Sequence, residues 1–221
     1  MDTKIVIECL SASNPVADIR DKVVLITGAG RGSGRMLAES LAAQGAIIAA
    51  NDITPVNVEQ VVEHILQQGG RAKAYIEDVA KKVGAQHLIK QVEDDFGRID
   101  ILINHASVEP HSPLLDMDEW DWHRVLDVNL TGAFLMTQSV GRVMRAQGRG
   151  VIIHLIGRSH TQAGIEAGAA FVASMSGLEG LSRQAARELA PDGIQVHAVE
   201  TGSDQVLARI MELLAGEEEK P

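Results

Sequence analysis

Residues 23–34 read Val-Val-Leu-Ile-Thr-Gly-Ala-Gly-Arg-Gly-Ser-Gly, and this stretch decides the fold. Its aliphatic first half, Val23 to Thr27, is typical of a buried strand, and Met36 to Gln44 has the apolar spacing of a helix. Glycines permit a tight turn and a close approach of backbone to ligand, and a helix N-terminus stabilises negative charge. A glycine-rich turn between a strand and a helix therefore predicts a site for the pyrophosphate of a dinucleotide.

On both sides of this stretch, short aliphatic runs alternate with longer segments of helical period. Six strands are predicted, at Val23 to Thr27, Ala46 to Asn51, Ala72 to Glu77, Ile99 to Asn104, Val151 to Ile156 and Ile194 to Val199. A helix is expected in every intervening segment. Alternating strands and helices are typical of a parallel sheet covered on both faces. The sequence therefore predicts an α/β fold with a doubly wound parallel sheet of six core strands.

We expect one dinucleotide-binding domain over residues 1–221, because no Pro-, Gly- or Ser-rich linker separates the strand–helix units. Residues 1–20 are expected to be an N-terminal extension and residues 216–221 a charged tail. Within the extension, apolar and charged residues alternate, which predicts an edge strand from Ile5 to Leu10. We expect that strand to lie beside the sixth core strand.

The composition narrows the function classes. The chain has 30 acidic and 20 basic residues and a net charge of −10, so it would repel nucleic acid. The single cysteine fits a reducing compartment, and no apolar run is long enough for a membrane helix, so a cytoplasmic protein is expected. Tyr75 is the only tyrosine. A mechanism that needs a tyrosine outside the third predicted strand is therefore excluded.

The second predicted strand ends at Asn51 and is followed by Asp52, 24 residues after Gly28. This spacing is close to the roughly 20 residues expected for a carboxylate that binds the ribose hydroxyls of a dinucleotide. A carboxylate there repels a 2′-phosphate and favours NAD over NADP. Arg31 points the other way, because a cation in the glycine-rich turn can pair with such a phosphate. Asp52 is given more weight, since a phosphate beside a carboxylate is costly.

Several motifs together resemble the short-chain dehydrogenase/reductase family. They are Thr27-Gly28 with Gly32 and Gly34, Asp78-Val79, Asn104-His105-Ala106-Ser107, Asn129 within Asp127-Val-Asn-Leu-Thr-Gly132, and Gly193-Ile-Gln-Val-His-Ala-Val199. The likeness covers about residues 22–202. It departs from the family at His105 and Ser107, where asparagine and glycine are usual.

The resemblance implies a Rossmann-type fold and a nicotinamide dinucleotide cofactor. It implies contacts to the adenosine and pyrophosphate from Gly28, Arg31, Gly32, Ser33, Gly34, Asp52 and Ile53. It also implies that Asp78 and Val79 hold the adenine and that Asn104 and Ala106 border the cofactor. The family usually continues beyond the position of Gly202 into a substrate-covering segment and a seventh strand. Here we expect both to be absent, with one last helix from Gln205 to Leu214.

By the same resemblance, the family's catalytic tyrosine and lysine align with Phe171 and Met175. A phenyl ring has no proton to donate, and a thioether has neither charge nor donor. The family's serine aligns with Gly157, or with Arg158 if the loop differs by one residue. Asn129 is the retained member of the relay, although a purely structural role for a helix-distorting asparagine is at least as well supported. Phe171, Met175 and Leu178 share one helix face, which favours apolar packing over an apolar ligand pocket.

Five side chains could replace the missing acid. Ser159 could reach the serine position through a small loop adjustment. His105, His111, His154 and His160 are placed at or just after the ends of the fourth and fifth strands, where ligands bind in this architecture. Each histidine alone is more often a surface or core residue. The spacing of the histidines matches no metal motif, so no metal site is expected.

The sequence thus supports three functions. The favoured one is an NAD(H)-binding member of the family that is catalytically impaired and acts as a binding or scaffold subunit. The alternatives are an active NAD-dependent oxidoreductase with a relocated His or Ser, and a structural subunit without cofactor. The resemblance also implies a homodimer, because the family commonly dimerises through two helices and the corresponding stretches, 125–143 and 171–189, are apolar enough to repeat that packing. A heteromer with an active paralogue is the alternative.

Overall fold

The computed structural model describes residues 18–157, 168–201 and 205–215. Its strands are β1 (Val23–Thr27), β2 (Ile47–Asn51), β3 (Arg71–Tyr75), β4 (Ile101–Asn104), β5 (Gly150–Ile156) and β6 (Ile194–Glu200). The first helices are α1 (Gly32–Ala43), α2 (Pro55–Gln67) and α3 (Lys82–Phe96). They are followed by α4 (Glu119–Leu126), the π-helical turn η1 (Asp127–Gly132), α5 (Ala133–Gln147), α6 (Ala169–Leu189), the 3₁₀ turn η3 (Ala190–Asp192) and α7 (Val206–Ala215).

The six strands form one parallel sheet in the order β3-β2-β1-β4-β5-β6. Every residue of β1, β4 and β5 is buried, which explains why these strands are almost continuously apolar in sequence. The chain steps outward from β1 to β3, returns to β4 beside β1, and then steps outward again to β6. β1 and β4 are therefore neighbours whose connecting segments leave in opposite directions, the arrangement that opens a ligand crevice at the carboxyl ends of the strands.

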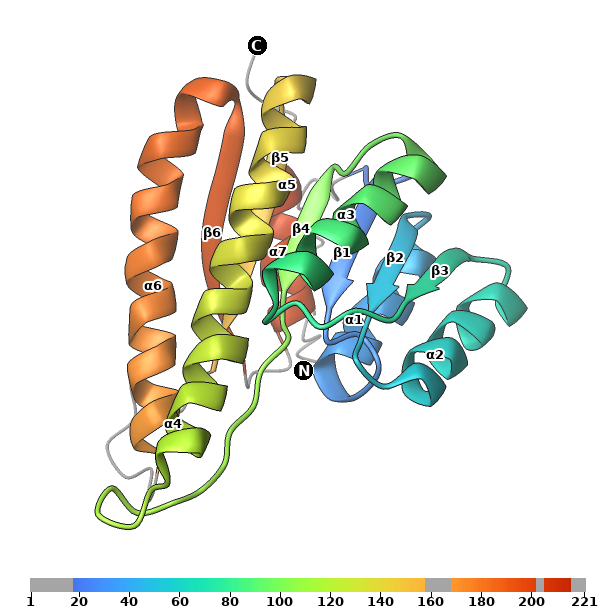
Figure 1. Cartoon of the computed structure of the whole chain (residues 1–221). Helices are drawn as coiled ribbons and strands as arrows, with labels where there is room; N and C mark the ends of the chain where they lie inside the picture. Colours follow the sequence, from blue (N-terminus) through green and yellow to red (C-terminus); the bar gives the residue numbers. More distant parts are fainter. Residues whose placement is uncertain (1–17, 158–167, 202–204, 216–221) are drawn as a thin grey trace, which may run out of the picture.

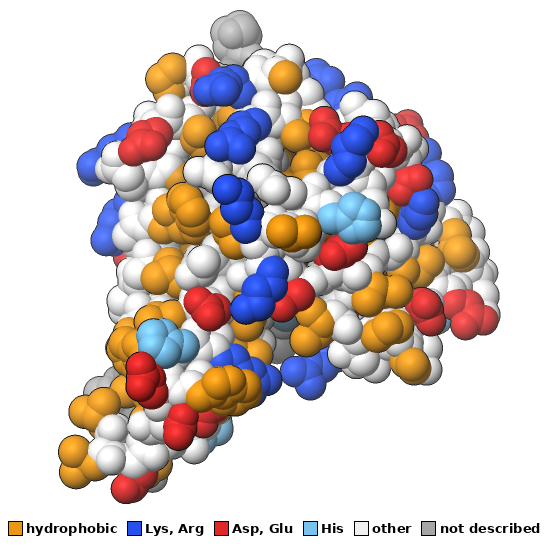
Figure 2. Space-filling model, viewed as in Figure 1, with side chains coloured by type: hydrophobic (Ala, Val, Ile, Leu, Met, Phe, Trp, Pro, Cys, Tyr) orange, Lys and Arg blue, Asp and Glu red, His pale blue; other side chains and the backbone are white. Residues whose placement is uncertain are grey.

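Helices cover both faces of the sheet (Figure 1). α1, α2 and α7 pack on one face, in a core that includes Leu37, Val61 and Ile210. α3, α5 and α6 pack on the other, around residues such as Leu88 and Met136. α4 and the loop before it project beyond the end of the sheet in Figure 1. Figure 2 shows hydrophobic side chains gathered on this projection, which includes the exposed Leu114, Leu115 and Trp120.

The predicted Rossmann-type sheet and its six strands are confirmed, with strand ends shifted by at most two residues. The first helix differs more, because it begins at Gly32 rather than Met36. Glycine has a low helix propensity, so the pattern placed the start after the glycines, whereas Gly32 and Gly34 form the first turn. The last helix lies one residue later than predicted. The predicted strand from Ile5 to Leu10 and the charged tail lie outside the described residues.

No helix in the described part of the chain is long and apolar enough to cross a membrane.

Candidate functional site: a dinucleotide cleft between β1 and β4

The ends of β1 and β4 are held together by Thr27. Its Oγ1 accepts hydrogen bonds from the backbone amides of His105 and Ala106, both at 3.1 Å. Gly28 follows with a φ of +69°, and a Cβ there would lie 2.8 Å from the Cα of Ala106. Only glycine satisfies both the left-handed backbone and this close approach. The turn after β1 is therefore pressed against the end of β4, and a cleft opens above it.

The glycine-rich turn then leads into an uncapped helix. A Cβ on Gly34 would lie 2.2 Å from the Gly28 carbonyl oxygen, so this glycine lets α1 pack closely on the turn. Gly32 has a φ of +55° and open space where a Cβ would point, and it lines the cleft. No side-chain hydrogen bond caps the start of α1. Free first-turn amides facing an open space fit the pyrophosphate of a dinucleotide.

Asp52 lies at the end of β2, where the sequence places the ribose carboxylate. Its Oδ2 accepts a hydrogen bond from the Gly30 amide at 3.0 Å, and its Oδ1 accepts one from the Thr54 amide at 2.9 Å. The carboxylate therefore fixes the glycine-rich turn and the start of α2 while it lines the cleft. Arg31 is exposed and lines the same part of the cleft. The carboxylate that favours NAD and the guanidinium that favours NADP therefore lie at one corner of the cleft.

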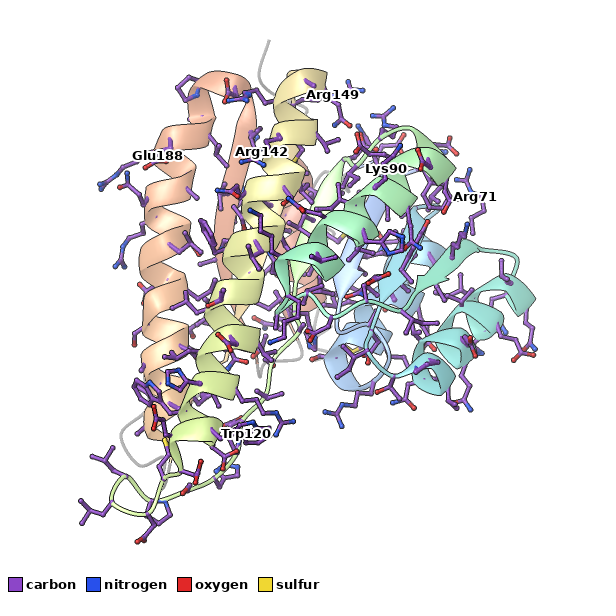
Figure 3. All side chains as sticks on the ribbon, viewed as in Figure 1. Arg71, Lys90, Trp120, Arg142, Arg149 and Glu188 are labelled. Atoms are coloured by element: carbon purple, nitrogen blue, oxygen red, sulfur yellow. The ribbon has the colours of Figure 1, made fainter. Side chains whose placement is uncertain are left out.

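The part of the cleft beyond Asp52 is a cavity of about 460 Å³. Ile53 is 68% exposed there, and Asp78 and Val79 line the opposite side, as the family resemblance implies. Sequence reasoning missed the contribution of α4. Trp120, labelled in Figure 3, is 65% exposed and lines this cavity. The Cζ atom of Arg124 lies over its ring, 5.2 Å from the ring centroid. The signal available in the sequence was Trp120 four residues before Arg124, a spacing that places both on one helix face.

Ser33 and His105 meet across the cleft. Ser33 Oγ lies 2.7 Å from Nε2 of His105, so the first turn of α1 is joined to the end of β4 by a side-chain hydrogen bond. Both residues line a second cavity of about 810 Å³, together with Arg31 and Arg124. The sequence flagged His105 as a departure from the family pattern, but the spacing of 72 residues gave no sign of its partner.

The far end of this larger cavity is closed by the side chains at the relay positions. Phe171 and Met175 are buried and pack in a small apolar core with Leu178 and Ile156. A Cβ on Gly157 would lie 2.3 Å from Cζ of Phe171, and the Gly157 amide donates to Sδ of Met175 at 3.3 Å. The Phe171 ring therefore fills the space that any side chain at 157 would need. The predicted apolar packing of this helix face is confirmed, and Phe171 and Met175 also line the cavity.

Asn129 is buried within the π-helical turn η1. Its Oδ1 accepts from the Val108 amide at 2.8 Å, and its Nδ2 donates to the Val108 carbonyl at 3.0 Å and to Ser174 Oγ at 3.1 Å. Asn129 thus ties the loop after β4 to α6, which is a structural role. A part in catalysis stays a prediction.

His154 is not at the rim of the cleft, so its predicted position is wrong. It lies two residues inside β5, and the two-residue alternation of a strand turns it toward α5 and α6 with Ile152. Its ring is 0% exposed and bridges Thr137 Oγ1 at 2.8 Å and Ser182 Oγ at 2.6 Å. Ser182 donates its proton to the Leu178 carbonyl, so His154 Nδ1 donates to Ser182 and Nε2 accepts from Thr137. Burial lowers the pKa of His154 to about 4.

The remaining predicted residues divide into two groups. Asn104 and Ala106 follow β4 as predicted, and Asn104 Nδ2 donates to Thr137 at 3.4 Å while its Oδ1 is buried without a partner in the described structure. Ser159 and His160 lie outside the described residues. Within residues 18–157, 168–201 and 205–215, no three His, Cys, Asp or Glu side chains cluster in a way that could hold a metal ion.

Comparisons with known proteins agree with this geometry. Residues 22–207 match a family model described as short chain dehydrogenase. The chain is 39% identical over 183 residues, 82% of its length and 75% of the relative's, to a 3-oxoacyl-[acyl-carrier-protein] reductase of Staphylococcus epidermidis. It superimposes with a TM-score of 0.85 and 27% identity on a metagenomic short-chain oxidoreductase in complex with NADP, covering 92% of this chain and 95% of that one. NAD⁺-bound xylitol dehydrogenase gives a TM-score of 0.79 and 32% identity, over 87% and 75% of the two chains.

The contact between Gly157 and Phe171 predicts a coupled effect on stability. We expect Gly157→Ala to lower the free energy of unfolding by about 1–3 kcal/mol, because the new methyl overlaps the ring. Phe171→Leu should also destabilise the protein, by about 1 kcal/mol or more, through lost packing. In the double variant, the loss of unfolding free energy should be smaller than the sum of the two single-variant losses by at least ~1 kcal/mol, measured by urea unfolding. Additive losses would contradict the contact.

The buried His154 predicts acid sensitivity. The folded protein holds this proton more weakly than the unfolded chain, where the ordinary pKa is about 6.5. Stability that is complete above pH 6.5 should therefore fall by up to roughly 3 kcal/mol as the pH approaches 4. His154→Asn removes this titration, so its difference from the wild type in unfolding free energy should shrink as the pH falls. The exposed His64→Gln variant is the control. A difference between His154→Asn and the wild type that stays constant with pH would contradict the prediction.

Proposed function

Because the chain belongs to the short-chain dehydrogenase/reductase family, we propose that it binds NAD(H) in the cleft between β1 and β4 but lacks an efficient proton relay. In this proposal it acts as a binding or regulatory subunit. The observation that carries the proposal is the Phe171 ring packed against Gly157, with Met175 Sδ on the same backbone amide. The binding half of the cleft keeps its polar groups, whereas the reacting half is closed by carbon and sulfur.

The residues of the binding half have separable roles. The first-turn amides of α1 would hold the pyrophosphate, Asp52 the adenosine ribose, and Ile53 with Val79 the adenine faces. A bound nicotinamide would supply hydride transfer. Carbonyl reduction also needs a proton at the substrate oxygen, and neither Phe171 nor Met175 can donate one.

The preferred cofactor in this proposal is NAD. Solved relatives bind either NADP or NAD, so the family alone does not decide between them. Asp52 supports NAD because its carboxylate lines the ribose corner and would repel a 2′-phosphate. Both of its oxygens accept backbone hydrogen bonds, which fixes the negative charge at that place. Arg31 is exposed on the same corner and supports the competing preference.

We also propose that the chain associates through α5 and α6, as a homodimer or with an active paralogue. The support is a half-exposed apolar side chain, Phe134, beside a surface groove between these helices. Arginine and glutamate residues line the same groove, including Arg142 and Glu188, which Figure 3 labels on α5 and α6. A second copy would offer the same apolar centre and opposite charges.

The proposed function predicts binding without efficient turnover. NADH should bind saturably, with a Kd below roughly 1 mM, and should quench the emission of Trp120, which lines the cavity. A panel of alcohols, ketones and 3-oxoacyl substrates should turn over very slowly at high protein concentration. Restoring the relay in the triple variant Gly157→Ser, Phe171→Tyr and Met175→Lys should raise turnover by about 10²–10⁴-fold.

Two outcomes would contradict this proposal. Absence of NADH binding at millimolar concentration would leave a structural subunit, and fast wild-type turnover would leave an active oxidoreductase. If turnover were seen and were lost in Ser159→Ala or His160→Gln, the acid would be a relocated side chain. The measurements of NADH binding and turnover on the wild-type protein do not require the triple variant to fold. Thermal unfolding shows whether that variant is folded.

The ribose corner predicts a change in cofactor preference. Asp52→Asn removes the negative charge, so NADH affinity should fall about tenfold and the NADPH-to-NADH affinity ratio should rise by tenfold or more. Arg31→Ala is the matched variant and should lower that ratio. Both dissociation constants are measured by fluorescence, with thermal unfolding to register the lost backbone contacts of Asp52. An unchanged ratio in Asp52→Asn would contradict the assignment.

A further inference from the structure

Ser33 is among the residues that the family resemblance assigns to the cofactor, but its hydrogen bond with His105 has been given no role. Ser33 is the second residue of α1, so its side chain lies among the free first-turn amides, 2.7 Å from the imidazole Nε2. The backbone of His105 is fixed by Thr27, which accepts from its amide. The imidazole is therefore held beside the place where a pyrophosphate would bind, on a rigid strand end rather than on a mobile surface arm.

The hydrogen-bond partners of the two His105 ring nitrogens limit where the ring can carry its proton. His105 Nδ1 is buried and has no hydrogen-bond partner in the described part of the chain. A neutral ring whose Nε2 accepts from Ser33 uses the only hydroxyl proton, so Ser33 has no proton left for a ligand. A ring that carries its proton on Nε2 donates to Ser33 and frees the Ser33 hydroxyl for another acceptor. The second arrangement gives an anion at the start of α1 one additional donor.

Charged and titratable groups of both signs face this part of the cleft. They come from the turn after β1, the ends of β2 and β3, the loop after β4, and α4. They are Arg31, Asp52, Glu77, Asp78, Lys81, Glu109, His123, Arg124 and Asp127. Asp52 favours a proton on His105, and so does the nearby Gly28 carbonyl, although its geometry falls short of a hydrogen bond. Burial outweighs both and lowers the pKa of His105, so without an added anion the ring is neutral at pH 7.

We propose that His105 is a positioning residue that takes up a proton when the pyrophosphate of a dinucleotide binds, and that it then donates through Ser33 to that anion. The inference rests on the proposed cofactor binding and concerns how that binding depends on pH. An anion close to the ring stabilises the imidazolium, in which both nitrogens carry protons. Ser33 is then oriented with its hydroxyl proton toward the ligand.

The sign of the pH dependence follows from linkage. A ligand that raises the affinity of His105 for a proton must bind more tightly as the pH falls through the range in which the ring becomes charged. The pyrophosphate diester of ADP-ribose has no ionisation of its own between pH 6 and 8. A change in its affinity over that range therefore reports on the protein.

The test uses the whole protein and ADP-ribose in isothermal titration calorimetry. From pH 8 to pH 6 the wild-type Kd should fall by about 3–10-fold, and titrations in buffers of different ionisation enthalpy at pH 7 should show proton uptake. His105→Gln keeps an amide within reach of Ser33 but cannot titrate, so its Kd should change by less than about twofold with no proton uptake. Ser33→Ala should weaken binding by several-fold. His64→Gln is the control, because this exposed histidine lies on α2 and does not line the cleft, and it should behave as the wild type.

Each outcome separates the two proposals. If neither ADP-ribose nor NADH binds at any pH, the proposed function fails. If both bind but the wild type shows no pH dependence or proton uptake, the role of His105 is overturned while cofactor binding stands. Retention of the pH dependence in His105→Gln, or its loss in His64→Gln, also overturns it. Thermal unfolding of each variant at pH 8 separates a loss of fold from a loss of binding.

Discussion

The parallel pairing of β1 with β4 is the constraint on which the cleft depends. Two neighbouring strands whose continuations leave in opposite directions cannot fill the space above their carboxyl ends, so the fold itself provides a crevice. Thr27 fixes how wide that crevice is at its base, because its hydroxyl accepts from two consecutive amides of the β4 exit. Gly28 then allows the glycine-rich turn to touch that exit. Everything that faces the cleft is positioned from this junction.

The cleft has two halves of different character. One is polar and is formed by the turn after β1 and by the ends of β2, β3 and β4, where Asp52, Ser33 and His105 lie. The other is formed by β5 and α6, where Phe171 and Met175 pack with their neighbours. Asn129 connects the two halves, because its amide holds both the loop after β4 and Ser174 of α6. The apolar packing of the second half is therefore compatible with an intact polar scaffold in the first.

Periodicity and turn chemistry predict the sheet well, because they depend on local features such as the aliphatic run at Val23 to Thr27 and the glycines after it. The positions of Gly28, Gly32 and Asp52 follow from such features, whereas Val79 is implied only by the family resemblance. Side-chain direction in a strand buried on both faces does not, and this is why His154 was placed at the cleft when it faces α5 and α6. The bond between Ser33 and His105 joins residues 72 positions apart and depends on the β1–β4 pairing. No local pattern in the sequence carries that information.

The contact between Gly157 and Phe171 limits which substitutions the chain can accept. The ring lies where any β-carbon at position 157 would have to be, so the observed ring position requires a residue without a side chain at 157. A side chain at 157 is therefore compatible with the fold only if residue 171 moves or is shortened at the same time. The two positions are constrained as a pair rather than one at a time.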